Sequence, residues 1–364
     1  MGETTLETLR AELQEVNLEL LDLLSRRARL VTEVQAIKSR EGIPTYVPER
    51  EQAMLEELVE ANPGPFSAET VRHLFKEIFK ACLQLMESEK RQVLRVSRAS
   101  GEADLRLRIG GEWVGGEPVV IAGPCSVEDA EQMEAVARRL RALGIGLMRG
   151  GAYKPRSSPY AFQGLGRAGL ELLRDAARRH GLATVTEVMD TRNVELVAEY
   201  ADVLQIGSRN MYNYDLLREV GRTGRPVLLK RGLSATLEEF LWAAEYVVLQ
   251  GNKQVILCER GIRTFETQTR NTLDLSAVAL LRRQTWLPVI VDVSHAAGRK
   301  DILAPLARAA LAAGAHGIMV ETHPCPAVAR SDAQQQLDLD EFERFLDEAG
   351  LRRGAARRRA AGEN

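Results

Sequence analysis

A glycine-punctuated stretch from Met148 to Pro159, MRGGAYKPRSSP, combines the residue types of an anion-binding loop. Its pair of glycines allows the backbone to approach a ligand closely, and the proline that follows Lys154 stiffens the loop. Arg149 and Arg156 offer forked donors that suit phosphate or carboxylate, whereas Lys154 offers a compact charge that can also give up a proton. The stretch therefore predicts an anion site, with a solvated basic loop as the alternative.

Eight short apolar runs predict the scaffold that carries this loop. They begin at Val119, Gly146, Ala183, Val203, Pro226, Gln254, Pro288 and Gly317, and a helical pattern follows each of them. Eight βα units in about 235 residues are the number and the length typical of an α/β fold of the (β/α)8 TIM-barrel type. A doubly wound sheet is the alternative, but the chain has no dinucleotide-binding glycine fingerprint.

Polar residues at the ends of these runs predict one shared site. They are Cys125, Arg149, Lys154, Glu187, Arg209, Lys230, Arg260, His295 and Glu321. Barrel enzymes assemble their sites at the C-terminal ends of the strands. We therefore expect these side chains to meet on one face of the barrel.

Four residues of this segment have the donor atoms of a metal site. Cys125, His295, Glu321 and Asp332 supply one sulfur, one nitrogen and two carboxylate oxygens. This mixture suits a divalent ion such as manganese, iron, cobalt or zinc better than magnesium, which avoids thiolate. The wide spacing of the four residues is weak support by itself, because a single buried cysteine is common in protein cores.

The other candidates form a cationic set. Those expected to converge on one pocket are Arg149, Lys154, Arg209, Lys230 and Arg260, with Arg263 close behind. So many like charges in one cleft repel each other unless a ligand neutralises them. A substrate with several negative charges is therefore expected, and phosphate plus carboxylate is the natural combination.

The first ninety residues have the pattern of three helices. Apolar residues at alternating steps of three and four predict one long helix, in which the seam is interrupted by Arg27. Pro48 is expected to open the second helix, and Ser67 to cap the third. The seam consists of Leu6, Leu9, Leu13, Val16, Leu20, Leu23, Leu30, Val34 and Ile37. Because three helices cannot bury all these faces alone, we expect a dimer.

Charged residues in this helical segment predict a second anion site. Lys38 lies 11 residues after Arg27, about three turns on and nearly on the same face, so the two cations could bracket an anion. Arg10 lies beside the seam, where it could reach a neighbouring subunit. With these residues the segment resembles the all-helical chorismate mutases, which are intertwined three-helix dimers.

The resemblance to chorismate mutases implies specific roles and one departure. It places ligand-binding roles on Arg10 (lent to the partner's site), Arg27, Lys38, Arg50 and Glu51. Met86 stands where the family has the glutamine that donates to the breaking ether oxygen, and Val47 stands where an acidic residue is common. A thioether cannot donate a hydrogen bond, and the loss of one such donor costs about a hundredfold or more in rate. We therefore expect a weak or silent mutase.

Three interpretations of the helical domain stay open. It is a sensor that binds prephenate or chorismate without turnover, a working mutase, or a plain dimerising module. Binding of prephenate without turnover would separate the first from the other two.

The barrel segment resembles the type I beta class of 3-deoxy-D-arabino-heptulosonate 7-phosphate (DAHP) synthases, from about Glu117 to Gly350. The motifs that carry the resemblance are AGPCSVE, LMRGGAYKPRSSPYAFQG, TEVMD, QIGSRNM, LLKRG, CERGIRTFE, DVSHAAGRK, ETHP and SDAQQQ. A mutase-like domain fused ahead of such a barrel is a known family arrangement. It implies that a later product of the shikimate pathway controls its first step.

This resemblance implies a metal-dependent condensation of phosphoenolpyruvate with erythrose 4-phosphate. The residues implied to hold phosphoenolpyruvate are Arg149, Lys154, Arg209, Lys230 and Arg260, with the backbone around Ser208 at its phosphate. Arg156 and Ser157 would take the phosphate of the aldehyde. The ligands of the metal, manganese in the first place, would be Cys125, His295, Glu321 and Asp332. Lys154 would protonate the new alkoxide, and Glu187 and Asp292 are candidates for ordering water or a sugar hydroxyl.

Two other enzymes remain as alternatives for the barrel. The octulosonate-phosphate synthases perform the same condensation on arabinose 5-phosphate, but their loop reads more like KANRSS than the KPRSS found here. A Schiff-base aldolase would use Lys230 as its nucleophile. In such an aldolase, the cysteine, the histidine and the carboxylates that are predicted to bind a metal would have no role in the reaction.

The amino-acid composition limits the classes of binding partner and the cellular compartment that we expect for this chain. The chain has 364 residues, 45% of them hydrophobic, and a formal net charge of -2, so no global field attracts nucleic acid or an anionic membrane. No apolar run has the length of a signal peptide or a membrane span, and four dispersed cysteines suit reduced thiols. We expect a cytoplasmic enzyme that forms a dimer through its helices, and a tetramer overall.

The expected domain boundaries follow from these patterns. Residues 1–90 form the helical domain, and residues 91–116 form a linker with a short hairpin. Residues 117–350 form the barrel. Residues 351–364 form a basic, solvated tail.

Overall fold

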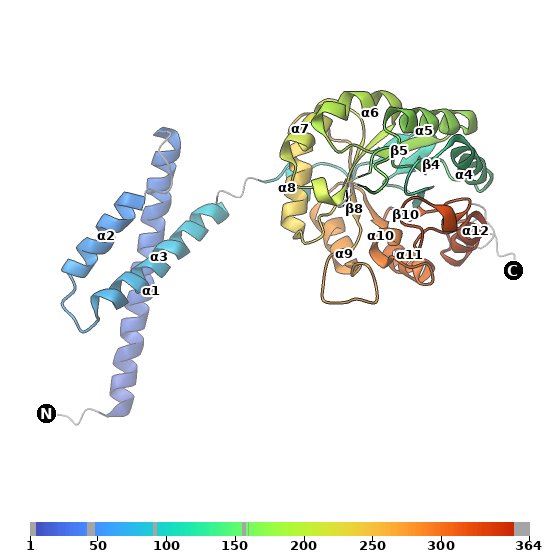
Figure 1. Ribbon diagram of the computed structural model, residues 1–364. Coiled ribbons are helices and arrows are strands. Elements are labelled where there is room, and N and C mark those ends of the chain that lie inside the picture. The colour runs from blue at the N-terminus through green and yellow to red at the C-terminus, as the bar shows by residue number, and fades with distance from the viewer. Residues whose placement is uncertain (1–4, 42–47, 90–92, 155–157, 159, 353–364) are drawn as a thin grey trace. The chain divides into compact units, whose positions relative to one another are not determined.

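The computed structural model describes residues 5–41, 48–89, 93–154, 158 and 160–352. Contacts between Cα atoms divide the chain into two compact units, Met1–Gln92 and Val93–Asn364. Figure 1 shows the first as a group of helices and the second as a ring of strands surrounded by helices. Each unit is described by itself.

The N-terminal unit contains the three helices expected from the sequence. They are α1 (Leu6–Glu41), α2 (Pro48–Glu60) and α3 (Ala68–Glu89). Ser67 caps α3, because its hydroxyl accepts a hydrogen bond from the backbone N–H of Thr70 at 3.2 Å. The α3 helix packs against both other helices.

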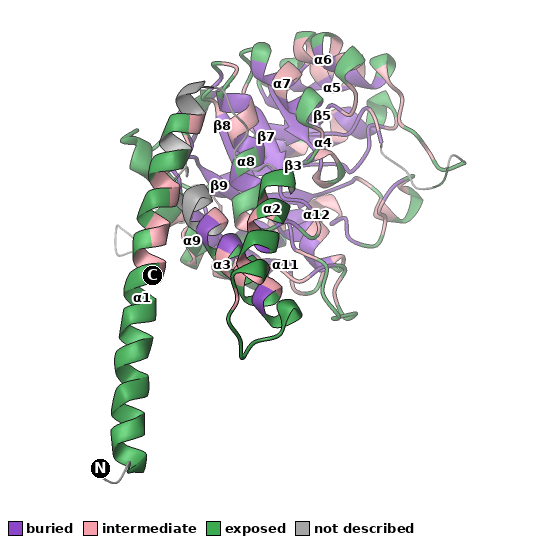
Figure 2. Cartoon of the chain, turned by 90° about the vertical axis from the view of Figure 1, so that its left-hand side faces the viewer, coloured by how far each residue is buried: buried purple, intermediate pink, exposed green. Residues whose placement is uncertain are grey.

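This helical unit buries little of its apolar surface. Among its described residues, the buried hydrophobic side chains are Leu55, Val71, Phe79 and Cys82. The seam of α1 is 45% to 64% exposed at all nine positions. Figure 2 shows most of α1 in the colour of exposed residues. The chain therefore leaves the seam of its longest helix without a partner inside this unit.

The second unit is a closed barrel of eight parallel strands, in the order β10-β3-β4-β5-β6-β7-β8-β9. The strands are β3 (Val119–Gly123), β4 (Leu147–Arg149), β5 (Ala183–Glu187), β6 (Val203–Ile206), β7 (Val227–Lys230), β8 (Val255–Glu259), β9 (Val289–Asp292) and β10 (Gly317–Glu321). All eight correspond to the apolar runs of the sequence. The TIM-barrel prediction is confirmed, and the doubly wound alternative is wrong because the first and last strands pair with each other.

Helices cover the outside of the barrel. They are α4 (Ala130–Ala142), α5 (Arg167–His180), α6 (Val194–Tyr200), α7 (Tyr214–Arg222), α8 (Leu237–Val248), α9 (Leu275–Gln284), α11 (Leu303–Ala312) and α12 (Leu339–Glu348). The short α10 (Val293–Ala297) directly follows the end of β9. Most of the buried side chains form one hydrophobic layer between these helices and the strands. A second cluster fills the barrel interior, and it includes Ile121, Leu147 and Met319. Because both faces of each strand are covered, the strands read as continuous apolar runs.

A hairpin closes one end of the barrel interior. It consists of β1 (Leu107–Ile109) and β2 (Glu112–Val114), which pair antiparallel. Its inward residues, Leu107, Ile109 and Val114, belong to the interior cluster together with Val119 and Ala183 at the starts of two strands. The opposite end, where the strands finish, is left for polar residues. Within the described part of the chain, no helix has the length and apolarity needed to cross a membrane.

Candidate active site at the ends of the strands

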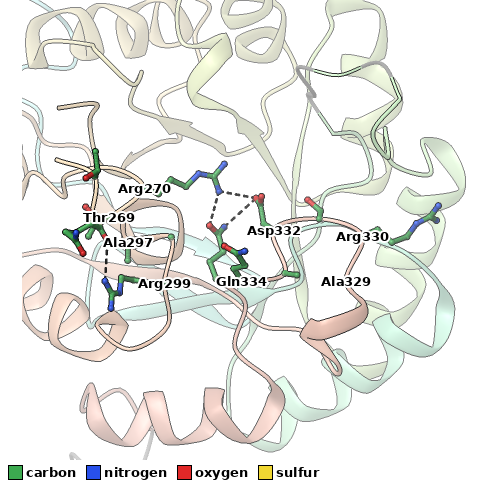
Figure 3. Close-up of a pocket in the computed structure, with 14 residues that line it drawn as sticks. Thr269, Arg270, Ala297, Arg299, Ala329, Arg330, Asp332 and Gln334 are labelled. Atoms are coloured by element: carbon green, nitrogen blue, oxygen red, sulfur yellow. Dashed lines mark hydrogen bonds and ion pairs between the residues drawn. The ribbon is translucent and has the colours of Figure 1, made fainter. Parts of the chain in front are cut away.

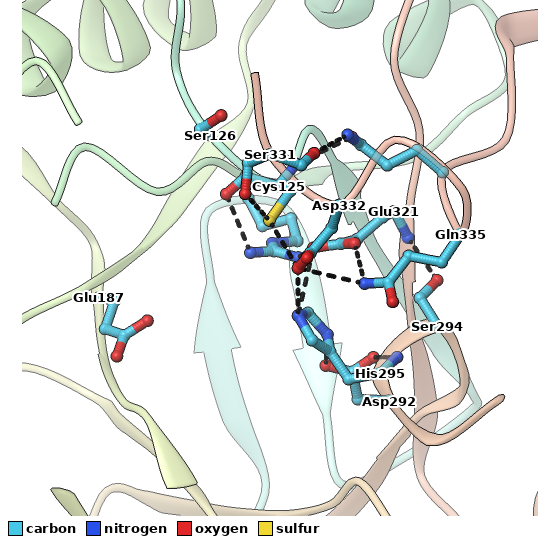
Figure 4. A network of polar contacts seen from close by, with 12 residues as sticks. Cys125, Ser126, Glu187, Asp292, Ser294, His295, Glu321, Ser331, Asp332 and Gln335 are labelled. Atoms are coloured by element: carbon cyan, nitrogen blue, oxygen red, sulfur yellow. Dashed lines mark hydrogen bonds and ion pairs between the residues drawn. The ribbon is translucent and has the colours of Figure 1, made fainter. Parts of the chain in front are cut away.

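Four side chains from three consecutive regions of the barrel meet as a possible metal-binding group. Cys125 follows β3, His295 lies in α10 after β9, Glu321 ends β10, and Asp332 lies in the loop after β10. One ligand atom from each lies within 4.8 Å of all the others. Figure 4 shows the four side chains pointing toward one another.

The spacings within this group fit bonds to one central ion. Cys125 Sγ lies 3.3 Å from Asp332 Oδ2, and His295 Nε2 lies 3.4 Å from Glu321 Oε1 and 3.8 Å from Asp332 Oδ2. Ligands at about 2.0 to 2.3 Å from a tetrahedral ion stand roughly 3.5 Å apart. The donor set of thiol, imidazole and carboxylates therefore fits a transition metal in both chemistry and spacing.

Backbone strain accompanies one of these ligands. Among the described residues, Asp332 is the only residue other than glycine with a positive φ, at 49°. Such a conformation costs free energy and persists where the surroundings enforce it, often at functional sites. The loop is tied back to the barrel because Gln336 Oε1 accepts a hydrogen bond from the backbone N–H of Cys125 at 3.0 Å.

Burial and neighbouring charges set the protonation of the group. Burial, and then the negative charge of Glu321, raises the pKa of the Cys125 thiol to about 12. Burial lowers the pKa of His295, so the ring is a neutral ligand at neutral pH. Burial alone would raise the pKa of Glu321, but attraction to the protonated form of His295, and then to Arg149, outweighs burial and lowers it. The same balance, with Arg270 as the main cation, lowers the pKa of Asp332 to about 2.

Asp292 orients the histidine of the group. Its Oδ2 accepts a hydrogen bond from His295 Nδ1 at 2.7 Å and another from the ammonium of Lys230. With Nδ1 protonated, Nε2 presents its lone pair to the other ligands. Asp292 is fully buried and is not among the residues that line the neighbouring cavity. Asp292 therefore lies behind His295, and its candidate role in ordering a water or a sugar hydroxyl stays a prediction.

A cavity of about 290 Å³ opens beside this group and is strongly cationic. Its basic lining residues are Arg149, Lys154, Arg209, Lys230, Arg260, Arg263 and Arg270. The acidic ones are Glu187 and Asp332, and Ser208 and His295 also contribute to the wall. The structure therefore brings together the five cations expected from the sequence, the nearby Arg263, and Arg270, which sequence reasoning missed.

The surroundings of these basic side chains favour the binding of an anion. Burial lowers the pKa of Arg260, because a charged guanidinium is costly to keep in a dry pocket. Arg149 pairs with Glu321, and its buried Nε has no hydrogen-bond partner among the described residues. Lys154 donates from Nζ to the carbonyl of Cys125 at 3.0 Å and lies 3.1 Å from its sulfur. A polyanionic ligand would satisfy these donors.

Two glycines are required by the close packing of this site. A Cβ on Gly151 would lie 2.7 Å from the carbonyl oxygen of Cys125, and one on Gly207 would lie 2.1 Å from Glu187 Oε1. Gly151 belongs to the stretch from Met148 to Pro159, so its role there is close approach of the backbone. Arg156 and Ser157 of that stretch lie outside the described residues.

A buried ion network supports the cationic wall from behind. Arg231 Nη1 lies 2.9 Å from both Glu259 Oε2 and Asp274 Oδ2. Since successive residues of a strand point to opposite sides, Arg231 and Glu259 pair on the side away from Lys230 and Arg260. Sequence reasoning missed this network, because Arg231 and Glu259 lie at the ends of apolar runs without any marker of their partners.

A second cavity of about 610 Å³ lies next to the first. Figure 3 shows its lining, in which Arg270 reaches Asp332. Arg270 and Asp332 line both cavities, so the two are contiguous at this pair. The second cavity also includes Arg299 and Arg330 and is therefore cationic too.

The residues of the helical unit that are predicted to bind an anion differ from one another in their contacts and in their exposure to solvent. Arg27 donates to Cys82 Sγ at 2.9 Å, and its guanidinium lies 4.7 Å from the ring centre of Phe79. Arg10 and Arg50 are exposed, whereas Lys38 and Glu51 are partly buried. Val47 and the side chain of Met86 lie outside the described part of the structure.

The chain matches two family models. Residues 102–350 match the DAHP synthetase I family, and residues 9–87 match chorismate mutase type II. The phospho-2-dehydro-3-deoxyheptonate aldolase of Thermotoga maritima is 52% identical over 254 residues, which are 70% of this chain and 75% of that protein. The 2-dehydro-3-deoxyphosphooctonate aldolase of Acidithiobacillus ferrooxidans is 33% identical over 245 residues, which are 62% of this chain and 86% of that protein.

Solved structures of the same kind superpose on the chain. A crystal structure of the phospho-2-dehydro-3-deoxyheptonate aldolase (DAHP synthase) of Thermotoga maritima gives a TM-score of 0.70 at 49% identity, over 74% of this chain and 78% of that one. A truncated form of the 3-deoxy-D-arabino-heptulosonate 7-phosphate synthase from the same organism gives 0.67 at 46% identity, over 74% and 98% of the two chains.

Proposed function

The chain belongs to the DAHP synthetase I family and carries a chorismate mutase type II domain at its N-terminus, and on this premise we propose how it works as a DAHP synthase. The proposed reaction is the condensation of phosphoenolpyruvate, erythrose 4-phosphate and water to DAHP and phosphate. One observation carries it: a metal-type ligand group shares His295 and Asp332 with the wall of a strongly cationic cavity. This arrangement supports the binding of a polyanion next to a Lewis acid.

Phosphoenolpyruvate has a phosphate and a carboxylate, and both need cations in a dry pocket. The proposed ligands are Arg149, Lys154, Arg209, Lys230 and Arg260, with Ser208 at the phosphate. The fixed positions of these side chains would hold C3 of phosphoenolpyruvate in line with the aldehyde carbon. Arg156 and Ser157 are proposed to take the phosphate of erythrose 4-phosphate.

Cys125, His295, Glu321 and Asp332 are proposed to hold one divalent ion, with manganese first and iron, cobalt or zinc as alternatives. A bound ion would supply Lewis acidity at the aldehyde oxygen. The thiol ligand disfavours magnesium. Asp292 keeps the proton of His295 on Nδ1, which leaves Nε2 free to ligate.

Lys154 is proposed as the general acid. C3 of phosphoenolpyruvate attacks the aldehyde carbon, and the carbonyl electrons become an alkoxide that takes a proton from Lys154 Nζ. Water then adds at C2, and phosphate leaves with cleavage of the C–O bond. Glu187 lines the cavity away from the ligand group, as Figure 4 shows, and is a candidate for ordering this water.

The synthase test uses purified, metal-loaded protein with phosphoenolpyruvate and erythrose 4-phosphate, followed by loss of enolpyruvyl absorbance. Activity should disappear with a chelator and return with manganese. Arabinose 5-phosphate tests the octulosonate alternative, which the lower identity to that enzyme already disfavours. Trapping of a substrate on Lys230 by borohydride would contradict the proposal and support a Schiff base.

The helical domain is proposed to be a sensor of prephenate or chorismate that also dimerises the chain. The exposed seam of α1 supports dimerisation, and the cations Arg10, Arg27, Lys38 and Arg50 support an anionic effector. Met86 in place of the family's glutamine supports a weak mutase. Inhibition of condensation by prephenate with little chorismate turnover is the expected result, whereas rapid turnover would favour a bifunctional enzyme.

A further inference from the structure

Gln335 is buried directly beside the proposed metal ligands, although its side chain cannot itself donate a strong ligand to a transition metal. It is 3% exposed and follows Asp332 by three residues in the loop after β10. Its backbone N–H donates to the carbonyl of Asp332 at 3.3 Å, which closes the turn that carries the positive φ. A buried amide next to two carboxylates must have a defined set of partners, because an unsatisfied amide there is costly.

The partners of Gln335 fix its orientation. Its Nε2 donates to Glu321 Oε2 at 2.6 Å, and its Oε1 accepts from Arg270 Nη1 at 2.9 Å. A guanidinium can only donate and an ionised carboxylate can only accept, so the amide has one arrangement that satisfies both. Gln335 is therefore a fixed bridge from Arg270 to Glu321.

This bridge determines which oxygen of Glu321 faces the ligand group. Oε2 is occupied by Gln335, and Oε1 lies 3.4 Å from His295 Nε2. Arg270 Nη1 also lies 3.4 Å from Asp332 Oδ2, and Gln335 Nε2 lies 3.5 Å from the same oxygen. One amide and one guanidinium thus position both carboxylates of the group, as the dashed contacts of Figures 3 and 4 show.

We propose that Gln335, anchored by Arg270, is a positioning residue that holds Glu321 and Asp332 in the geometry that binds the metal. The inference rests on the metal centre of the proposed function. Outer partners of this kind fix the orientation of ligands, and their loss costs about 10- to 100-fold in metal affinity. Without the amide donor, Glu321 Oε2 loses this hydrogen bond while Oε1 keeps its contact with Arg149, so the carboxylate is held less firmly in the arrangement that binds the metal.

The experiment titrates metal-free protein with cobalt(II) and follows both affinity and the visible spectrum. Cobalt reports geometry through its d–d bands and reports the Cys125 ligand through a thiolate charge-transfer band. The variant is Gln335→Met, which keeps the length of the side chain and removes both hydrogen bonds. The matched control is Gln334→Met, the same change on the exposed neighbour. Thermal melting checks that both variants fold.

Wild type and Gln334→Met should bind one cobalt per chain with the same spectrum, and Gln335→Met should bind about 10- to 100-fold more weakly with altered d–d bands. Arg270→Met serves as a second variant if Gln335→Met does not fold, and it should also weaken cobalt binding. In the double variant the losses should add only in part, because Arg270 acts through its bridge to Gln335 and also contacts Asp332 directly. Wild-type affinity and spectrum in Gln335→Met would overturn the role of Gln335, whereas the absence of stoichiometric cobalt binding in wild type would instead overturn the proposed metal centre.

Discussion

Lys154 is placed for chemistry rather than for solvent contact. It is 7% exposed, and its ammonium lies 3.1 Å from the sulfur of Cys125, a proposed metal ligand, and lines the cationic cavity. Its Nζ donates to the carbonyl of Cys125 at 3.0 Å and also lines the cationic cavity, so it can reach an oxygen of a substrate bound there. This position agrees with the general-acid role proposed for Lys154.

Replacing Lys154 by Met should separate proton transfer from metal binding. The side chain keeps most of its volume, so the fold should be retained, while kcat should fall by about 10²- to 10⁴-fold. Cobalt binding should be retained, because Lys154 is not one of the four proposed ligands. The control is Lys253→Met at the protein surface, where the lysine pairs with Glu102. An unchanged kcat in Lys154→Met would exclude Lys154 as the acid.

The buried His316 lies outside the candidate active site and should make the unfolding free energy of the protein depend on pH. Its Nδ1 accepts a hydrogen bond from the backbone N–H of Val289 at 2.9 Å, which requires an unprotonated nitrogen. Burial, and then the positive charge of Arg282, lowers the pKa of His316 to about 4. The unfolded side chain takes up its proton near pH 6.5. Below that pH the unfolded chain binds more protons, so this contribution to stability is complete above about 6.5 and is lost as the pH falls toward 4.

The variant His316→Asn should flatten this part of the pH profile. Asn places its Oδ1 near the position of Nδ1, so it keeps an acceptor for Val289 but does not titrate. Between pH 7 and 4, wild type should lose on the order of 2 kcal/mol more unfolding free energy than the variant. Urea unfolding at several pH values measures this difference. Parallel pH profiles of the two proteins would contradict it.

We expect the long helix α1 to gain stability from outside its own unit. Isolated helices are marginal in water, and most of their stability in proteins comes from burying an apolar face. The seam of α1 is about half exposed or more within the chain, so a second copy is the simplest source of this burial. The helix is therefore the element on which the proposed dimer depends.

Leu13→Glu should weaken this dimer. Leu13 lies in the seam and is 62% exposed in the single chain. Burial of a leucine contributes about 1.5 to 3 kcal/mol, so the dimer should dissociate at least tenfold more readily. Sedimentation equilibrium measures the change, and Glu15→Ala, on the opposite face of α1, is the control. A dimer that is equally stable in Leu13→Glu would show that this seam is not the interface.

At the scale of the whole molecule, the barrel unit includes a segment that precedes its first strand. The backbone N–H groups of Arg95 and Val96 donate to Glu245 at 3.1 Å, and the indole of Trp286 donates to the carbonyl of Arg95 at 2.7 Å. Val96 is fully buried. The unit described from Val93 onward thus has its own core and its own N-terminal contacts.

A chain that begins at Val93 should therefore fold and keep DAHP synthase activity. It should lose inhibition by prephenate or chorismate, because the proposed effector site lies in the first 92 residues. Initial rates with and without prephenate, in full-length and truncated protein, test this. Inhibition that survives the truncation would place the effector site in the barrel.

The sequence by itself determined the barrel architecture and identified many of the side chains that meet at the ends of its strands. A barrel strand covered on both faces must be apolar throughout, so the eight strands appear as eight apolar runs. The chain direction of parallel strands puts every run end on one face, and this is why Cys125, His295 and Glu321 could be assigned to one site. The turn residues between the three helices, such as Pro48 and Ser67, gave their starts for equally local reasons.

The tertiary structure alone decided how the site is held together. Gln335 contacts Arg270, which is 65 positions away in the sequence, and Arg231 pairs with Asp274 at a separation of 43. Asp292 lies beneath His295 because of the turn into α10, which the spacing of the two residues permits but does not require. Local patterns report which face of an element is apolar. They do not report which buried polar groups satisfy each other, because that depends on distances between elements that only the closed barrel fixes.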